Sequence, residues 1–162
     1  PLRVRGHRIP LLGVAQRGTM RYMVKSTSYR LDPDLKARLA AQAAAEGVAE
    51  TTLVTRLLAQ GLSAIEHPGV VFRPGPSGWR AGLAGGPDVD EVIRALRATG
   101  ATGENAVAAA ADDLGISSRF VHIAVDYAAD HIDEIEARLL ANEAALERAR
   151  RLTAARAAVL AE

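Results

Sequence analysis

The chain has 162 residues, of which 49% are hydrophobic and 4% aromatic, and a formal net charge of +1. This length allows one ordinary domain or two small ones, and abundant alanine and leucine with few aromatics favour helices. Because the chain contains no cysteine, disulfides and thiolate metal sites are excluded. No apolar run reaches the roughly 20 residues that a membrane-spanning helix needs. We therefore expect a cytoplasmic protein.

The charges are distributed unevenly along the chain. Residues 1–31 contain seven lysines and arginines and no acid, whereas the remaining residues contain 13 basic and 19 acidic groups, a net charge of −6. A basic end on an acidic body indicates a nucleic-acid partner.

Residues 1–22 are predicted to stand apart from the folded chain. They show no periodicity, and both Met20 and Met23 are plausible starts for translation. The apolar stretch IPLLGVA follows arginines, as in a signal peptide, but it is minimal for that purpose. We expect a disordered basic arm or upstream translated sequence.

The stretch STSYRL alternates with the period of a strand. One face carries Thr27, Tyr29 and Leu31, and the other carries Ser26, Ser28 and Arg30. A lone strand cannot satisfy its own backbone groups. It needs a partner, which is either Val70–Phe72 of the same chain or, as the better solution, the same strand of a second copy.

Two helices are predicted directly after this strand. Asp32 and Pro33 suit a helix start, and Gly47 suits its end. The apolar positions of the first helix are Leu35, Leu39 and Ala43, and those of the second, which runs to about residue 66, are Leu53, Val54, Leu57, Leu58, Leu62 and Ile65.

The segments STSYRL, DPDLKARLAAQAAAEG and VAETTLVTRLLAQGL together resemble the ribbon-helix-helix family of dimeric bacterial repressors and antitoxins, the CopG and Arc type. The resemblance implies that residues 23–66 dimerise through Thr27, Tyr29, Leu31, Leu35, Leu39, Leu53 and Leu57. It also implies that the paired strands enter the DNA major groove. The implied DNA contacts are Arg21, Lys25, Ser26, Ser28, Arg30, Thr51 and Thr52.

One departure weakens the expected phosphate contact at the start of the second helix. The family usually has Ser or Thr just after the turn, where this chain has Ala49 and Glu50. Thr51 and Thr52 can supply a hydroxyl, but Glu50 repels phosphate. The alternative interpretation of the strand is a buried strand with a merely solvated polar face.

Residues 67–131 are predicted to form a β-hairpin followed by helices near 88–98, 103–114 and 118–130. The stretch AADDLGISSRFVHIAVDY resembles a helix-turn-helix, with Ala111, Gly115 and Val121 at the spacing of such motifs. The region from HPGVVFR through GGPDVDEVIRAL to VDYAADH further resembles a domain of VapB-type antitoxins. Its five arginines and eight acids make it a poor primary DNA binder. We expect a packing or dimerisation module, with Arg119 and His122 as secondary DNA candidates.

No catalytic or metal site is predicted, and we expect neither enzymatic activity nor a cofactor. The four histidines lack metal-ligand spacing, and the glycines of GPSGWRAGLAGG lack the Lys-Ser/Thr of a phosphate loop. His122 and Asp126 are four residues apart, which predicts a surface pair on one helix.

Residues 132–162 are predicted to form one long helix whose heptad is too broken for a coiled coil. Glu134–Arg138 and Glu147–Arg151 are favourable pairs at i,i+4. No core appears left for this helix to join, so we predict a partner-binding tail that uses Leu139, Leu146, Arg148, Arg150, Arg151 and Arg156. Resemblance to VapB-type antitoxins implies a PIN-like ribonuclease toxin as the partner.

The sequence as a whole predicts a mainly α protein: a ribbon-helix-helix domain, a β-hairpin with a helix-turn-helix-like domain, and a long C-terminal helix. The expected function is that of a homodimeric antitoxin that binds operator DNA, represses its own operon and neutralises a toxin. A stand-alone repressor and a helical adaptor without DNA binding are the alternatives.

Overall fold

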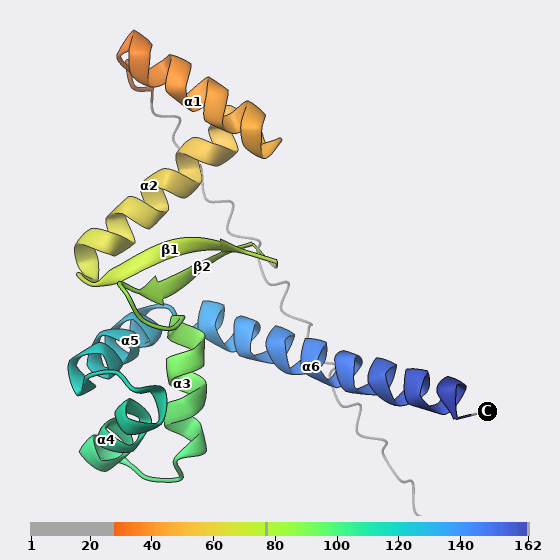
Figure 1. Cartoon of the computed structure of the whole chain (residues 1–162). Helices are drawn as coiled ribbons and strands as arrows, with labels where there is room; N and C mark the ends of the chain where they lie inside the picture. The colour runs from red at the N-terminus through yellow and green to blue at the C-terminus, as the bar shows by residue number, and fades with distance from the viewer. Residues whose placement is uncertain (1–27, 77, 162) are drawn as a thin grey trace, which may run out of the picture.

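The computed structural model describes residues 28–76 and 78–161. It is mainly helical with one two-stranded antiparallel sheet, as predicted. The β-hairpin lies between a helix pair on one side and three short helices on the other, and the last helix runs away from the body (Figure 1). The elements are α1 (Pro33–Glu46), α2 (Glu50–Glu66), β1 (Val70–Gly75), β2 (Gly78–Leu83), α3 (Val89–Ala98), α4 (Gly103–Leu114), α5 (Ser118–Asp130) and α6 (Ile132–Leu160).

The helix pair α1–α2 begins and turns where the sequence predicts. The Asp32 side chain accepts hydrogen bonds from the backbone N–H groups of Asp34 (2.9 Å) and Leu35 (3.3 Å), which satisfies two amides at the start of the helix. Gly47 ends α1 in the left-handed conformation, with φ of 67°. The pair buries little: in these two helices only Ala43 and Leu53 are buried.

The predicted N-terminal strand is not formed in the single chain. Residues 28–32 are neither helix nor strand, while Ser26, Thr27 and the arm at 1–22 lie outside the described residues. Within the described ranges β1 pairs with β2, so Val70–Phe72 does not serve residues 28–31 as a partner. The prediction that Val70–Phe72 pairs with the N-terminal strand is therefore wrong. Pairing β1 with β2 closes a much shorter loop than pairing β1 with residues 28–31 would, and so costs less conformational entropy.

The hairpin forms one wall of the core. In its antiparallel register Val70 lies opposite Leu83 and Arg73 opposite Arg80. Buried side chains of β1 and β2 share one core cluster with residues of α3, α4 and α5, and the hairpin itself contacts α3 and α5. The largest fully buried side chains of this core are Leu83, Val89, Val92, Val121, Tyr127 and Ile135.

The helices α3, α4 and α5 match the predicted ranges to within a residue. Asp88 and Glu91 form a reciprocal capping box at the start of α3. Gly115 links α4 and α5 in the left-handed conformation (φ 64°), and Ala111 and Val121 on either side are buried. At the positions that have helix-turn-helix spacing, Ala111 and Val121 are thus core residues and Gly115 forms the turn between the two helices.

The prediction that α6 has no core to join is wrong for its first half. Ile135 is 1% exposed, and Leu139 packs against the core of the body. Residues 140–161 are exposed throughout. The helix is therefore anchored on the body by its first three turns and extends outward from there (Figure 1).

Candidate DNA and partner interfaces

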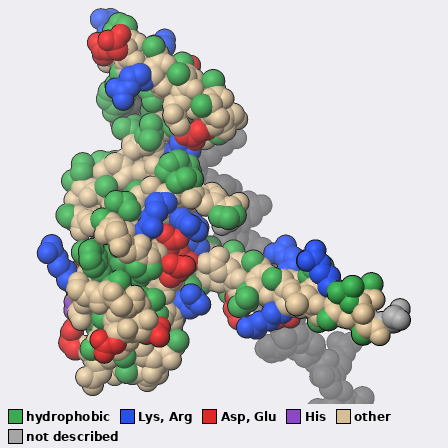
Figure 2. Space-filling model, viewed as in Figure 1, with side chains coloured by type: hydrophobic (Ala, Val, Ile, Leu, Met, Phe, Trp, Pro, Cys, Tyr) green, Lys and Arg blue, Asp and Glu red, His purple; other side chains and the backbone are tan. Residues whose placement is uncertain are grey.

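The predicted dimer core lies largely open on the helix pair. Tyr29 is 77% exposed, and Leu31, Leu35 and Leu57 are each above 40%. Leu39 is half-buried and Leu53 is fully buried, while Thr27 lies outside the described residues. Hydrophobic side chains are visible on this part of the surface in Figure 2. Three more leucine or isoleucine side chains of α2 are over half exposed: Leu58, Leu62 and Ile65.

The described DNA candidates lie beside this face. Ser28 and Arg30 are exposed and directly precede the Asp32 cap. Thr51 and Thr52 are exposed in the first turn of α2, where the N-cap residue Ala49 makes no side-chain hydrogen bond. The remaining candidates, Arg21, Lys25 and Ser26, lie outside the described residues.

One of the two secondary DNA candidates lies beside a carboxylate. Arg119 and His122 are exposed on α5. The His122 Nε2 lies 3.3 Å from the Glu104 Oε2 of α4, so its carboxylate neighbour is not the predicted Asp126. The tertiary contact between helices replaces the contact within one helix that spacing predicted.

The predicted partner residues on α6 divide into two groups. Leu139 is partly buried against the body and is therefore less available than predicted, whereas Leu146 is 53% exposed. The predicted Glu147–Arg151 pair forms at 3.8 Å. The other predicted pair does not form: Glu134 accepts a hydrogen bond from the Tyr127 hydroxyl (3.1 Å), and Arg138 turns to the hairpin. Exposed arginines continue along the outer half of the helix, namely Arg148, Arg150, Arg151 and Arg156.

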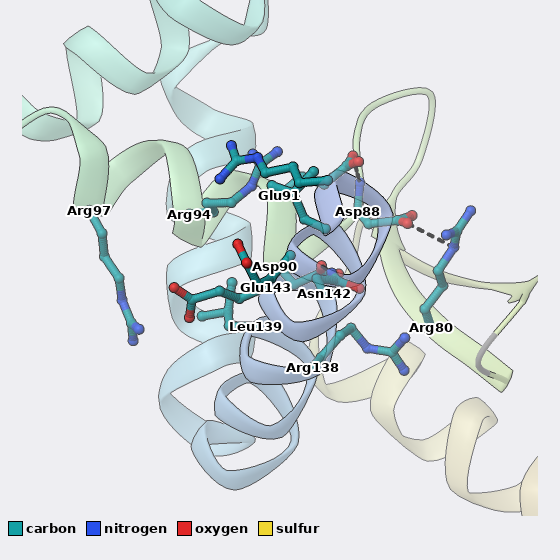
Figure 3. A pocket seen from close by; sticks show the side chains of 13 residues that line it. Arg80, Asp88, Asp90, Glu91, Arg94, Arg97, Arg138, Leu139, Asn142 and Glu143 are labelled. Carbon is teal, nitrogen blue, oxygen red and sulfur yellow. Dashed lines mark hydrogen bonds and ion pairs between the residues drawn. The ribbon is translucent and has the colours of Figure 1, made fainter. Parts of the chain in front are cut away.

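A cleft of about 820 Å³ lies between β2, α3 and α6. Figure 3 shows side chains from α3 on one side and Arg138, Leu139, Asn142 and Glu143 of α6 on the other. Both arginines and carboxylates line it, so the cleft carries charges of both signs. The cleft is the seam where α6 docks on the body.

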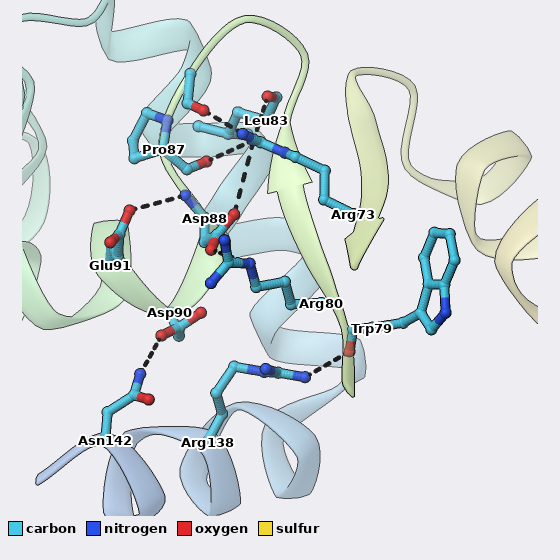
Figure 4. A network of polar contacts seen from close by, with 11 residues as sticks. Arg73, Trp79, Arg80, Leu83, Pro87, Asp88, Asp90, Glu91, Arg138 and Asn142 are labelled. Carbon is cyan, nitrogen blue, oxygen red and sulfur yellow. Dashed lines mark hydrogen bonds and ion pairs between the residues drawn. The ribbon is translucent and has the colours of Figure 1, made fainter. Parts of the chain in front are cut away.

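Two buried carboxylates organise this seam (Figure 4). Asp88 lies 2.7 Å from the Arg80 Nε and 3.7 Å from the Arg73 Nη2. Asp90 accepts a hydrogen bond of 2.7 Å from the Asn142 amide of α6. Burial raises the pKa of Asp90, and the positive charge of Arg138 opposes that shift.

A second set of contacts joins the helix pair to the hairpin, and the sequence did not predict it. The Arg56 guanidinium of α2 lies 4.5 Å from the centre of the Trp79 ring. Its Nη1 lies 2.7 Å from the Glu46 Oε2 of α1, and this contact and that of Gln42 hold the pKa of Glu46 below its usual value. The available signal was the chain's single tryptophan, set in a glycine-rich turn.

Comparisons of the chain with protein-family models, with curated proteins and with solved structures find no match. In the ranges 28–76 and 78–161, no helix combines the length and apolar character that a bilayer crossing requires. Across the same ranges no group of three or more His, Asp or Glu side chains is placed to hold a metal ion.

Proposed function

We propose that the protein is a homodimeric DNA-binding antitoxin that represses its own operon. The observation that carries the proposal is the open apolar face of the helix pair, next to the exposed polar side chains of Ser28 and Arg30. Burying a leucine side chain is worth about 1.5–3 kcal/mol. An apolar face of this size on a small helix pair therefore favours a second copy, which supplies the same surface about a two-fold axis.

The same association gives the N-terminal segment a partner. Two copies of residues 26–31 pair antiparallel, Tyr29 and Leu31 turn to the shared core, and Ser28 and Arg30 turn outward. A two-stranded ribbon fits the major groove, where Arg can bond guanine and Ser can bond several base edges. The basic residues before it add contacts to phosphates.

The outer half of α6 supports the toxin-binding part of the proposal. It is exposed from Leu140 onward, carries four arginines and ends on the apolar Val159 and Leu160, which are 75% and 86% exposed. An exposed helix that carries both arginines and apolar side chains can dock in a groove of a partner protein. The identity of the partner as a PIN-like ribonuclease toxin rests on the resemblance to VapB-type antitoxins.

The DNA-binding part is tested by titrating the full chain with operator duplex from its own promoter region at several salt concentrations. We expect binding that weakens steeply with salt and that depends on Arg30. Arg119→Ala is the matched control, because it removes an exposed arginine from the acidic body. Binding that Arg119→Ala weakens and Arg30→Ala leaves intact would assign DNA recognition to the helix-turn-helix.

The toxin-binding part is tested by co-expressing the chain with the product of the adjacent gene and scoring growth and co-purification. The deletion should begin at Arg148, because removing residues from Ile132 onward also takes Ile135 out of the core. We expect the shortened chain to bind DNA and to lose protection against the toxin. Retained protection and co-purification would place the partner site elsewhere.

A stand-alone repressor is the alternative that shares the DNA-binding face, and it predicts that the adjacent gene product neither binds nor harms cells. A helical adaptor predicts no salt-dependent duplex binding at all.

A further inference from the structure

The helix pair is tied to the body first at the junction after α2. His67, which follows α2, is 8% exposed, and its ring meets the rings of Tyr127 (5.2 Å between centroids) and His131 (5.6 Å). The next residues, Pro68 and Gly69, lead directly into β1. A single attachment of this kind leaves α2 free to pivot about its end.

A second attachment lies further along α2. The Arg56 guanidinium, paired with Glu46, rests over the Trp79 ring near the tip of the hairpin. Arg56 precedes His67 by eleven residues, which corresponds to roughly 16 Å along a helix. Two attachment points this far apart define the direction of a helix, whereas either one alone does not.

Trp79 is also held from the opposite side. Its carbonyl accepts a hydrogen bond of 2.7 Å from the Arg138 Nη2 of α6. Figure 4 shows the carbonyl turned toward Arg138 and the indole ring directed away from it. The Nε atom of Arg56 is shielded from solvent without a hydrogen-bond partner, and a dehydrated guanidinium gains more from an aromatic face such as that of Trp79.

We infer that Trp79 is a positioning residue that couples α6 to the orientation of the α1–α2 helix pair. The chain of contacts runs from Arg138 to the Trp79 carbonyl, and from the Trp79 ring through Arg56 to Glu46. Its regulatory meaning rests on the proposed function: a partner that draws α6 away removes Arg138 from the hairpin and frees the helix pair to pivot at residues 67–69. In a dimer bound to two half-sites, that freedom alters how both bodies sit on the DNA.

The test measures orientation directly and uses no DNA. Because the native chain lacks cysteine, spin labels attach only at introduced cysteines, here Ala41→Cys in α1 and Ala129→Cys in α5, both exposed. Labelled chains are diluted with unlabelled chains so that each dimer contributes one pair of labels. Double electron–electron resonance then reports the distance distribution between helix pair and body.

We expect one narrow distance peak for the parent chain and loss of that peak in Trp79→Ala and Arg138→Met. Arg138→Lys should restore it, because an ammonium group still donates to the carbonyl. Arg97→Met is the matched control: Arg97 pairs with Glu136 of α6 but does not contact Trp79, so the peak should persist. If Trp79→Ala fails to fold, the two Arg138 variants decide.

A narrow peak that survives Arg138→Met, a broad distribution in the parent chain, or equal broadening by Arg97→Met would overturn the inference. None of these outcomes depends on whether the protein binds DNA. Failure of the coupling and failure of the proposed function are therefore distinguishable.

Discussion

The helix pair α1–α2 and the body that follows it differ in how much of their apolar side-chain surface they bury. The body, formed by the hairpin, α3, α4, α5 and the start of α6, closes its own core around Leu83, Val121 and Tyr127, which are each at most 1% exposed. The helix pair buries only Ala43 and Leu53 and leaves most of its large apolar side chains exposed. The body is thus complete as one chain, and the helix pair has the composition of half a core.

This comparison predicts that core substitutions lower the stability of the body, whereas substitutions in the helix pair weaken association. The largest expected effect is in the body. Tyr127→Ala should lower the free energy of unfolding by about 3–5 kcal/mol, because it leaves a cavity in a closed core. Urea denaturation followed by circular dichroism measures this. The loss should be independent of protein concentration, and a loss below about 1 kcal/mol would show that the body is not closed around this ring.

In the helix pair the damage should appear in association. If the proposed dimer forms, Leu31→Ala should weaken it by about 2–5 kcal/mol, since on our proposal a second copy covers Leu31 and makes it a core residue. The matched control is Leu140→Ala, which removes an equally large exposed side chain from α6. Sedimentation equilibrium of both variants measures the effect, and equal dissociation constants would place the interface elsewhere.

The polar face of the same segment should govern recognition without affecting stability. Arg30→Ala should cost roughly 1–3 kcal/mol of discrimination between the operator and altered sites. Lys25→Ala should weaken all sites alike and reduce the salt slope by about one. Fluorescence anisotropy with cognate and substituted duplexes measures both, and unchanged operator preference in Arg30→Ala would refute the ribbon assignment.

The smallest effect concerns the seam where α6 meets the body. Burial raises the pKa of Asp90, so the folded state binds its proton more readily than the unfolded state, whose pKa is about 3.9. The contribution of Asp90 to stability is therefore fully present below pH 3.9 and is lost as the pH rises through the folded pKa. Asp90→Asn keeps an oxygen that accepts the hydrogen bond from Asn142 but cannot ionise. The variant should therefore not lose stability as the pH rises through this range.

The measurement is the urea midpoint of both proteins across the acidic range and at pH 7. The stability of Asp90→Asn relative to the parent should rise as the pH increases through that window. A relative stability that falls with increasing pH would mean that the ionised carboxylate stabilises the seam.

The sequence predicted local structure well because short-range signals determine it. Asp32, Gly47 and Gly115 each act on their own turn, and the helices begin and end near them. Contacts between distant elements were not predictable in the same way. Nothing in the spacing of Arg138 or Asn142 indicates that they contact Trp79 and Asp90. Asn142 interrupts the apolar pattern of α6, and in the structure it is one of the residues that dock this helix on the body.

The N-terminal strand shows a different limit. Its alternation predicts two faces, but a strand needs a partner, and residues 28–32 are neither helix nor strand in one chain. The pattern of Tyr29, Leu31 and Arg30 therefore describes a surface that, on our proposal, a second copy completes.

The central claim is that the open face of the helix pair is covered by a second copy of the chain. Sedimentation equilibrium of the unaltered full chain, from low to high micromolar concentration, tests it most directly. The account predicts the mass of two chains, with dissociation to single chains only on dilution. A single-chain mass across the whole concentration range would contradict it, because the apolar face would then be stable in water without a partner.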